Sequence, residues 1–596
     1  MMRPYELLPM PFPQDHDPGE EDPGFFYNNF IKHFIPDMIQ MMDTGLAIDN
    51  DAVEELRKTV DEVLLGVEKS LADNDLIKQF QTARLPYAQK KHAEKCTAAI
   101  RDLDYYLKPF KESDVLHRTW VVNTYLRKLH KSKHCEDKWT LKDLKKFNIF
   151  LNDPFVAAIC EKRRFTENLD VQHGMVALAE YKLELWNRPR YENAEKPVDL
   201  PPFNPGSSKQ MKEFFEMAKV APYAFSKDTG EASWGRDQLE LAQKDTLDPL
   251  CSLSYALQAM IDYSSSSIIK TNFLKAFDKF TVDGVLHGNI KLFGAKSVRN
   301  TSNSPNLLNA PSTGSIYAKP LKRCFRAPDG KVIYTADLGA LEDRVIANVS
   351  DDTNKCNIFL EGLDGHSLNA CGYFPDQIAK IMGPNKDNVK YVKEFKRLVD
   401  EGDLKLEKIR QTSKAPTFKL AYGGYPDDDK GGVITQDIFD NYHNTLYPGI
   451  TDYRENYVLP ATQSQGYIHL GLGCRLYSND ARGHIRSLNN ATVQFWSILT
   501  LIAINEFNHR IREEGLQEHV QVTSSIYDSI YTQNTADPEI IKWVNDNLIE
   551  LMCVQYLEDE KIHNVAQGEI GPTWAELTKV PNNASAAEIA AIMETI

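Results

Sequence analysis

Four side chains recur at intervals of four residues within the segment IRQTSKAPTFKLAYGG. They are Arg410, Lys414, Phe418 and Tyr422, and Gly423 follows them. On an α-helix this spacing aligns the side chains in one stripe about 18 Å long, so the segment is predicted to be helical. We expect the two cations to lie toward the helix N-terminus, where the dipole also favours a triphosphate, and the aromatic pair to suit a base and a sugar. An isolated RxxxK pair is more often a solvated helix face, whereas the complete stripe favours nucleotide binding.

Two short β-strands are predicted, and each of them ends at an aspartate. Residues 331–337 (KVIYTAD) form an apolar, β-branched run that ends at Asp337. Residues 519–532 (HVQVTSSIYDSIYT) turn at Asp528, after a strand expected to place four alternating side chains on one face: Val520, Val522, Ser524 and Ile526. A single aspartate at a strand end is usually a turn former. Two carboxylates on neighbouring strands would instead suit a pair of Mg²⁺ ions, because hard cations prefer carboxylate oxygens.

The chain of 596 residues is long enough for several packed lobes. Two helices are predicted after Phe34, with a break at Gly45 and a cap at Asp49 or Asn50, and long helical stretches surround the two strands. A small sheet flanked by helices is an α+β fold. The sequence contains no run of about 18 apolar residues, so no membrane span is predicted. The nine cysteines lie without CxxC pairs, which indicates a reducing compartment, and we expect a cytoplasmic protein.

The net charge of −15 argues mildly against a nucleic-acid partner, because phosphate binding normally leaves a basic footprint. Whole-chain charge averages over lobes, however, and the stretch from Lys90 to Arg164 is rich in lysine and arginine. A basic groove inside an acidic protein is therefore compatible with the composition.

The stripe RxxxKxxxFxxxYG resembles motif B, the nucleotide-binding finger helix of the family A DNA polymerases. The family's other motifs follow in its order. TADLGALEDRVIANVSDD, which contains Asp337, resembles motif A, and SSIYDSIY, which contains Asp528, resembles motif C. VRNTSNSPNLLNAP resembles the primer-gripping segment, and RSLNNATVQ resembles the helix that contacts the duplex. The resemblance covers about residues 30–75 and 200–580.

The resemblance implies a right-hand polymerase with a small antiparallel palm sheet and a mostly helical thumb and fingers. It implies a DNA-directed DNA polymerase that acts on primer-template DNA and dNTPs, with two Mg²⁺ ions held by Asp337 and Asp528. It implies that Glu342 excludes a ribose 2′-OH. From its place in the stripe, Lys414 is hypothesised to be catalytic, as a proton donor to the departing pyrophosphate. The residues implied in nucleotide binding are Arg410, Lys414, Phe418, Tyr422, Glu342 and His366. The residues implied in DNA binding are Arg299, Asn306, Asn309, Arg486, Asn490 and Gln494.

The same resemblance divides the chain into successive segments. They are an N-terminal extension at 1–34, the start of the thumb at 35–75, a helical basic insertion at 76–200, the thumb at 201–285, the first part of the palm with motif A at 286–345, the fingers with motif B at 346–465, and the second part of the palm with motif C at 466–596. The basic insertion has no counterpart in the bacterial pattern. It is either a solvated helical insertion or a clamp for duplex DNA or for a protein partner.

Two departures from the family pattern bear on function. Motif C reads Tyr527-Asp528-Ser529 where the family usually has His-Asp-Glu, which keeps the metal-binding aspartate and loses the glutamate. No exonuclease segment is expected before the thumb. Proofreading would then come from a separate exonuclease chain, and a processivity factor is a second expected partner. These features suggest a phage replicase that works in the host cytoplasm.

Two other functions remain open from the sequence. A single-subunit RNA polymerase shares the palm and an RxxxK…YG helix, but Glu342 would block the 2′-OH pocket that such an enzyme needs. A non-catalytic DNA-binding replication factor would leave Asp337, Asp528, Arg410 and Lys414 without a role. Primer extension with dNTPs and with NTPs distinguishes the three.

Overall fold

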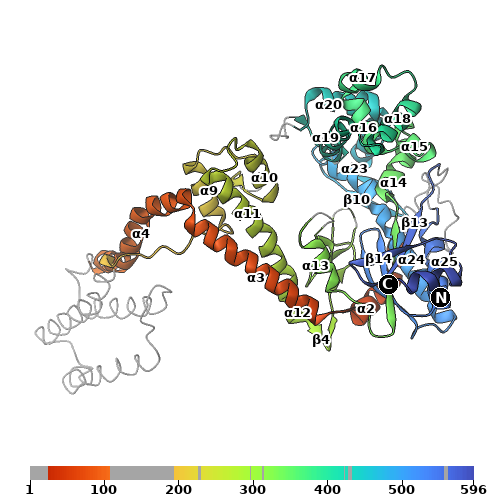
Figure 1. Cartoon of the computed structure of the whole chain (residues 1–596), viewed down its shortest axis with the longest axis horizontal. Coiled ribbons are helices and arrows are strands. Elements are labelled where there is room, and N and C mark those ends of the chain that lie inside the picture. The colour runs from red at the N-terminus through yellow and green to blue at the C-terminus, as the bar shows by residue number, and fades with distance from the viewer. Residues whose placement is uncertain are drawn as a thin grey trace, which may run out of the picture. The chain divides into compact units, whose positions relative to one another are not determined.

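A computed structural model describes residues 24–107, 194–225, 230–295, 297, 299–311, 315–421, 423–426, 433–555 and 561–596 of the chain (Figure 1). The described residues form two compact units. The first falls within residues 1–66, 222–241 and 261–596, and the second falls within residues 67–221 and 242–260. Within the described ranges, no helix is both long enough and apolar enough to cross a membrane.

A five-stranded antiparallel sheet lies at the centre of the first unit (Figure 1). The strands follow the order β11-β12-β8-β13-β14. Their bounds are β8 Lys331–Leu338, β11 Val520–Ile526, β12 Ser529–Thr535, β13 Ala566–Thr573 and β14 Glu576–Val580. β8 is the middle strand, and its β-branched and aromatic residues suit a position that is covered on both faces.

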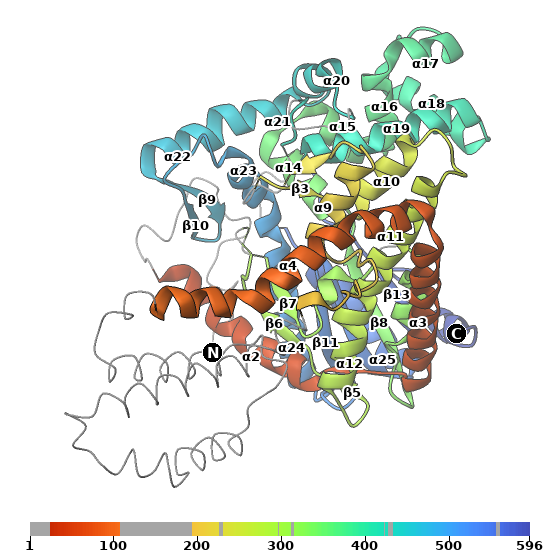
Figure 2. The same ribbon diagram turned by 90° about the vertical axis from the view of Figure 1, so that its left-hand side faces the viewer.

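The two faces of the sheet belong to different hydrophobic cores. Tyr334 of β8 packs into the larger core, whereas its neighbour Ile333 packs into a second core with Phe325 and Trp574. The face that packs into the larger core is covered by α2 (Lys32–Thr44), α24 (Ile498–Glu513) and α25 (Pro538–Met552). Figure 2 shows α24 and α25 beside the strands. Side chains alternate along a strand, so Asp337 lies on the same face as Ile333, at the strand end. There Asp337 is exposed.

The predicted strand around residue 522 contains a β-bulge, and the expected alternation is wrong beyond it. Val522 pairs with Thr532, but Ser524 pairs with Tyr531, so one extra residue is inserted between them. Val520 and Val522 consequently pack into the larger core, whereas Ile526 faces the second core. A bulge depends on the partner strand, which a single strand's pattern does not contain.

The N-terminal helices follow the prediction. α2 ends at Gly45, whose φ of 64° breaks the helix. α3 (Asn50–Asp73) begins after Asp49, whose Oδ1 accepts a hydrogen bond from the backbone N–H of Ala52 at 3.0 Å. Asp37 of α2 accepts hydrogen bonds from Asn505 and Asn508 of α24, which ties the N-terminal helix to the layer beside the sheet.

A helical lobe is inserted between β8 and β11. Its helices are α14 (Leu341–Ser350), α15 (Thr353–Leu360), α16 (Gly365–Tyr373), α17 (Pro375–Met382), α18 (Asn388–Asp400), α19 (Leu404–Ala421), α20 (Gln436–Asn441), α21 (Pro448–Asp452), α22 (Leu459–Gln465) and α23 (Ile485–Gln494), with the hairpin of β9 (Tyr467–Gly471) and β10 (Cys474–Tyr477) before α23. The motif B segment is α19, as its periodicity predicted.

Before β8 the first unit contains α12 (Lys275–Phe280) and short strand pairs. The strands are β1 (Leu46–Ala47), β4 (Thr281–Val282) and β5 (Val285–Leu286), the pair β2 (Ala224–Phe225) and β3 (Ala232–Ser233), and the hairpin of β6 (Asn289–Lys291) and β7 (Thr301–Asn303). A short α13 (Ala318–Arg323) leads to β8. The small sheet and the many helices confirm the predicted α+β class.

The second unit is helical where the structure describes it. Its elements include α4 (Asp75–Leu107) and α9 (Ser208–Met217). The chain passes between the two units within α3, between Ala221 and Pro222, within α10 (Arg236–Asp245) and within α11 (Ser252–Ile268). Phe80 of α4 packs edge-to-face on Phe214 of α9, with ring centroids 5.6 Å apart. Residues 108–193, most of the predicted basic insertion, lie outside the described residues.

Candidate active site

Asp337 and Asp528 lie side by side at one end of the central sheet. β12 pairs with β8 in a register that places Ser529 opposite Asp337, and the backbone N–H of Leu338 donates to the carbonyl of Asp528 at 3.1 Å. The Ser529 hydroxyl donates to Oδ1 of Asp337. Tyr527 adopts a φ of 53°, and the chain reverses in a tight turn formed by Tyr527 and Asp528. The adjacent strand ends thus bring together two carboxylates that are far apart in sequence.

The Asp528 carboxylate is poorly compensated. Its Oδ1 is buried and has no hydrogen-bond partner among the described residues. Burial raises the pKa of Asp528 to about 6; the positive charge of Arg299 opposes this rise, while the negative charges of Glu342 and Asp337 add to it. A buried carboxylate oxygen without a partner is a position that a cation would stabilise. Within the described ranges, no group of three or more His, Cys, Asp and Glu residues is close enough to hold a metal ion.

The raised pKa of Asp528 predicts a pH-dependent change in stability. The folded protein binds a proton at Asp528 more tightly than the unfolded chain does, so ionisation destabilises the fold as pH rises from about 4 to 6. In the absence of divalent metal at pH 8, Asp528→Asn is expected to raise the free energy of unfolding by about 1 to 3 kcal/mol. Thermal unfolding in EDTA measures this difference across pH. A variant that unfolds at a lower temperature than the wild type at pH 8 would contradict it, and Asp337→Asn, at an exposed position, is the control with a smaller expected change.

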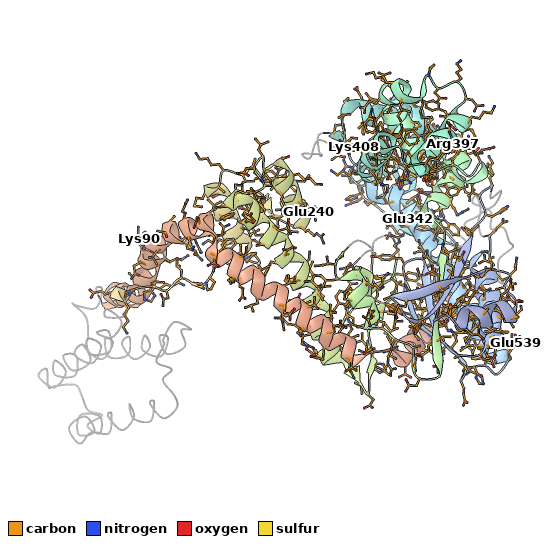
Figure 3. The ribbon with its side chains drawn as sticks, viewed as in Figure 1. Lys90, Glu240, Glu342, Arg397, Lys408 and Glu539 are labelled. Carbon is orange, nitrogen blue, oxygen red and sulfur yellow. The ribbon has the colours of Figure 1, made fainter. Side chains whose placement is uncertain are left out.

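Glu342 and Arg299 form an ion pair next to the two aspartates. Glu342 lies in the first turn of α14, directly after β8, and its Oε1 accepts a hydrogen bond from Nη2 of Arg299. Figure 3 shows Glu342 between the sheet and the helical lobe that carries Lys408. The Arg299 guanidinium also lies 5.9 Å from the centre of the Tyr527 ring. The ion pair therefore connects Glu342, which is predicted to select the sugar, with Arg299, which is predicted to contact DNA.

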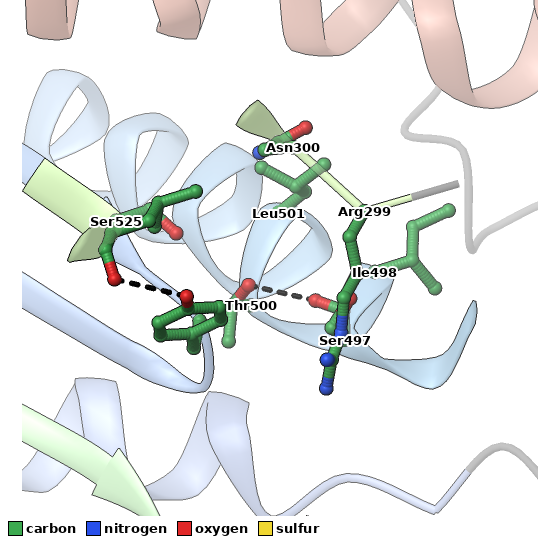
Figure 4. Close-up of a pocket in the computed structure, with 9 residues that line it drawn as sticks. Arg299, Asn300, Ser497, Ile498, Thr500, Leu501 and Ser525 are labelled. Atoms are coloured by element: carbon green, nitrogen blue, oxygen red, sulfur yellow. Dashed lines mark hydrogen bonds between the residues drawn. The ribbon is translucent and has the colours of Figure 1, made fainter. Parts of the chain in front are cut away.

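A small pocket opens beside this ion pair (Figure 4). Its lining residues are Arg299, Asn300, Leu308, Ser497, Ile498, Thr500, Leu501, Ser525 and Tyr527. The Tyr527 hydroxyl donates to the carbonyl of Leu308 at 2.9 Å, which fastens the motif C turn to the segment predicted to grip the primer. In that segment Asn306 has a buried Oδ1 with no partner among the described residues, whereas Asn309 is exposed.

α19 carries the predicted stripe, but the dipole argument for its cations is wrong. The helix begins at Leu404, so Arg410 and Lys414 lie in its second and third turns. The dipole acts mainly within the first turn. Arg410 instead forms a two-pronged ion pair with Asp364, and Lys414 is half-buried. The backbone of Phe418 lies in α19, but its side chain, like the whole of Tyr422, lies outside the described residues.

His366 lies near both cations of the stripe. It is in the first turn of α16, and its carbonyl accepts a hydrogen bond from the Ser413 hydroxyl of α19 at 3.1 Å. Burial lowers the pKa of His366; the negative charge of Asp364 opposes this, and the positive charges of Lys414 and Arg410 reinforce it. Arg410, Lys414 and His366 therefore form one cluster, which also contains the Asp364 carboxylate.

α23 carries the three residues predicted to contact the duplex. They are spaced four residues apart, so they lie on one face of the helix, and all three are half-buried: Arg486, Asn490 and Gln494. The Arg486 guanidinium lies 4.4 Å from the centre of the Tyr425 ring. Gly423 at the end of α19 has a φ of 77°, and a Cβ there would lie 2.7 Å from Cγ of Arg486. The end of the motif B segment therefore packs against α23.

Sequence reasoning missed two residues at this site. Asp364 binds Arg410, and Ser529 donates to Asp337. Ser529 follows Asp528 directly in the predicted hairpin, so its position beside the aspartates predicted to bind metal could have been inferred. Asp364 lies 46 residues before Arg410 and carries no local pattern that points to α19.

Residues 177–576 match the sequence profile described as DNA polymerase family A. The chain belongs to the family A DNA polymerases. The DNA polymerase I of Chloroflexus aurantiacus is 23% identical over 349 residues, which cover 56% of this chain and 34% of that protein. The DNA polymerase I of Pseudomonas aeruginosa is 25% identical over 394 residues, which cover 63% of this chain and 38% of that protein. The family A chain thus spans about a third of the length of these curated relatives.

A solved structure supports the same fold. The POL domain of Pol1 from M. smegmatis, in a complex with DNA primer-template and dNTP, superimposes with a TM-score of 0.57 at 16% identity. The match covers 94% of this chain and 72% of that chain. The predicted polymerase fold of this family A protein is confirmed. The predicted segment boundaries and the roles of single residues stay predictions.

Proposed function

We propose that the protein is a template-directed DNA polymerase that adds dNTPs to a primer 3′-OH. The observation that carries the proposal is that Asp337 and Asp528 lie beside each other at one end of the sheet, with a buried oxygen of Asp528 that lacks a partner among the described residues. Membership of family A and the DNA polymerase I relatives support the same reaction.

The two aspartates would hold two Mg²⁺ ions. Mg²⁺ binds proteins through one or two carboxylates and completes its coordination with water and substrate phosphates, so a site with two aspartates suits it. The bound ions would activate the primer hydroxyl and neutralise charge on the phosphates. Asp337 and Asp528 would hold the ions in position, and Ser529 orients the Asp337 carboxylate through its hydrogen bond.

The cluster of Arg410, Lys414 and His366 would bind the triphosphate of the incoming dNTP. Positively charged side chains that lie together on α16 and α19 can donate hydrogen bonds to phosphate oxygens. Lys414 is half-buried and forms no ion pair within the described part of the chain, so it is the group proposed to donate a proton to pyrophosphate. Phe418 and Tyr422 would face the base and the sugar, and Glu342 would exclude a 2′-OH.

The duplex would lie against two further groups of residues. The first group comes from the β6–β7 hairpin and the segment after it: Arg299 lies between the two strands, and Asn306 and Asn309 follow β7. The second group, Arg486, Asn490 and Gln494, comes from α23. The minor groove presents acceptors at similar positions for every base pair, so such contacts would test the shape of a pair without reading sequence. A phage origin, a separate exonuclease chain, a processivity factor and a cytoplasmic location stay predictions.

Primer extension tests the proposal directly. A labelled primer on a defined template is incubated with Mg²⁺ and either dNTPs or NTPs. We expect extension that follows the template with dNTPs and little extension with NTPs. Extension by NTPs would favour the RNA polymerase alternative, and DNA binding without extension would favour the non-catalytic replication factor.

A further inference from the structure

Asp364, which was not among the predicted site residues, forms an ion pair with Arg410, the first cation of the α19 stripe. Nε of Arg410 donates to Oδ2 of Asp364 at 2.8 Å, and Nη2 donates to Oδ1 at 2.9 Å. The side chains are only 14% and 21% exposed, respectively. A two-pronged pair with little access to water fixes the plane of the guanidinium as well as its charge.

Asp364 is itself held in place at the start of α16. It is the N-cap of that helix, and its Oδ2 accepts hydrogen bonds from the backbone N–H of Ser367 at 2.8 Å and from the Ser367 hydroxyl at 2.6 Å. Burial raises the pKa of Asp364, but the hydrogen bonds from Arg410 and Ser367 outweigh burial and hold the pKa below its ordinary value. The carboxylate is therefore an ionised and fixed anchor at neutral pH.

Two more hydrogen bonds join α16 to α19. The Ser413 hydroxyl donates to the carbonyl of His366 at 3.1 Å, and the hydroxyls of Thr417 and Tyr373 lie 3.1 Å apart. The start of α16 thus sets the positions of Arg410 and His366 together. The two hydrogen bonds to Asp364 come from Nε and Nη2 of Arg410, and Nη1 lies 3.9 Å from Oε2 of Glu407.

We propose that Asp364 is a positioning residue for an incoming nucleoside triphosphate. It holds the Arg410 guanidinium beside Lys414 and His366, with Nη1 of Arg410 left for a phosphate oxygen. The inference rests on the proposed polymerase function and deepens it. Asp364 neutralises the charge of Arg410, whereas Lys414 forms no ion pair within the described part of the chain, so the charge of Lys414 is left for a polyanionic triphosphate.

Asp364→Asn tests this role with little disturbance of the helix, because asparagine caps an α-helix about as well as aspartate does. The charge-assisted pair is lost, so we expect the KM for dNTP in single-nucleotide addition to rise about tenfold while kcat stays within about twofold. The equilibrium Kd for dNTP, measured on a dideoxy-terminated primer-template, should rise by the same factor. Glu407→Gln removes the other carboxylate near Arg410, at the longer distance, and is expected to change KM less than twofold.

A double-mutant cycle separates positioning from a general structural effect. If Asp364 acts through Arg410, Asp364→Asn has almost no further effect on KM in an Arg410→Ala background. An unchanged KM in the single variant, or an equal loss in both backgrounds, would overturn the proposal. Asp364→Ser, which also supplies a helix cap, replaces Asp364→Asn if that variant does not fold. Failure of the wild type to extend primers would instead refute the proposed function itself, before any variant is compared.

Discussion

Replacement of Asp337 or Asp528 by asparagine is expected to lower kcat for nucleotide addition by at least about 10³-fold. The amide keeps the size of the side chain but removes the charge that would bind the metal ions, and metal ions contribute several kcal/mol to a phosphoryl-transfer transition state. Single-turnover primer extension at saturating dNTP measures the rate. Affinity for primer-template DNA should change by no more than a few-fold, since these carboxylates make no attractive contact with phosphates on their own.

A matched control is available just before the same strand. Asp329 precedes β8 at its opposite end, where it pairs with Arg326 on the surface. Asp329→Asn should leave the extension rate unchanged. If Asp337→Asn and Asp329→Asn had the same rate as the wild type, the carboxylates at the strand ends would have no part in the reaction.

Glu342→Ala is expected to weaken discrimination against ribonucleotides by about 10- to 100-fold. The proposed reason is steric: the side chain fills the space of a 2′-OH, and forcing extra atoms into a filled site costs about 1–3 kcal/mol. The ratio of kcat/KM for dATP and ATP on the same primer-template measures the effect. Glu342 also pairs with Arg299, so its loss should alter the primer contact and lower the dATP rate modestly.

Two variants distinguish the steric explanation from others. Glu342→Gln keeps the side-chain volume and should retain most of the discrimination. Asp343→Ala removes the neighbouring carboxylate, which pairs with Lys355, and should leave the discrimination unchanged. Equal loss in Glu342→Gln and Glu342→Ala would mean that charge, and not volume, excludes the 2′-OH.

Local periodicity predicted the elements that carry the site. The four-residue spacing from Arg410 indicated α19, and two β-branched runs that end in aspartate indicated β8 and the β11–β12 hairpin. The signals for the helix and the hairpin are local, since each forms its hydrogen bonds within one segment. β8 was indicated by its residue types alone, because its partners β12 and β13 are distant in sequence. The meeting of Asp337 and Asp528 followed from the order of the family motifs, because no local pattern states which strands become neighbours.

The remaining features depend on contacts between distant segments. The bulge after Val522 follows from pairing with β12, and it moves Ile526 to the opposite face from the predicted one. The Asp364–Arg410 pair joins two helices of the inserted lobe, and helix packing decides which of many acidic residues meets Arg410. The start of α19 at Leu404 was also missed, because the stripe defines the face of a helix and not its first residue.

The binding of Mn²⁺ tests most directly whether Asp337 and Asp528 share divalent ions beside a nucleotide. The stoichiometry is measured by magnetic resonance of free Mn²⁺, with a dideoxy-terminated primer-template and the correct dNTP present to prevent turnover. We expect two ions per wild-type complex beyond those bound by DNA and dNTP alone, and a clear loss in Asp528→Asn and Asp337→Asn. The same two ions in both variants would contradict the account.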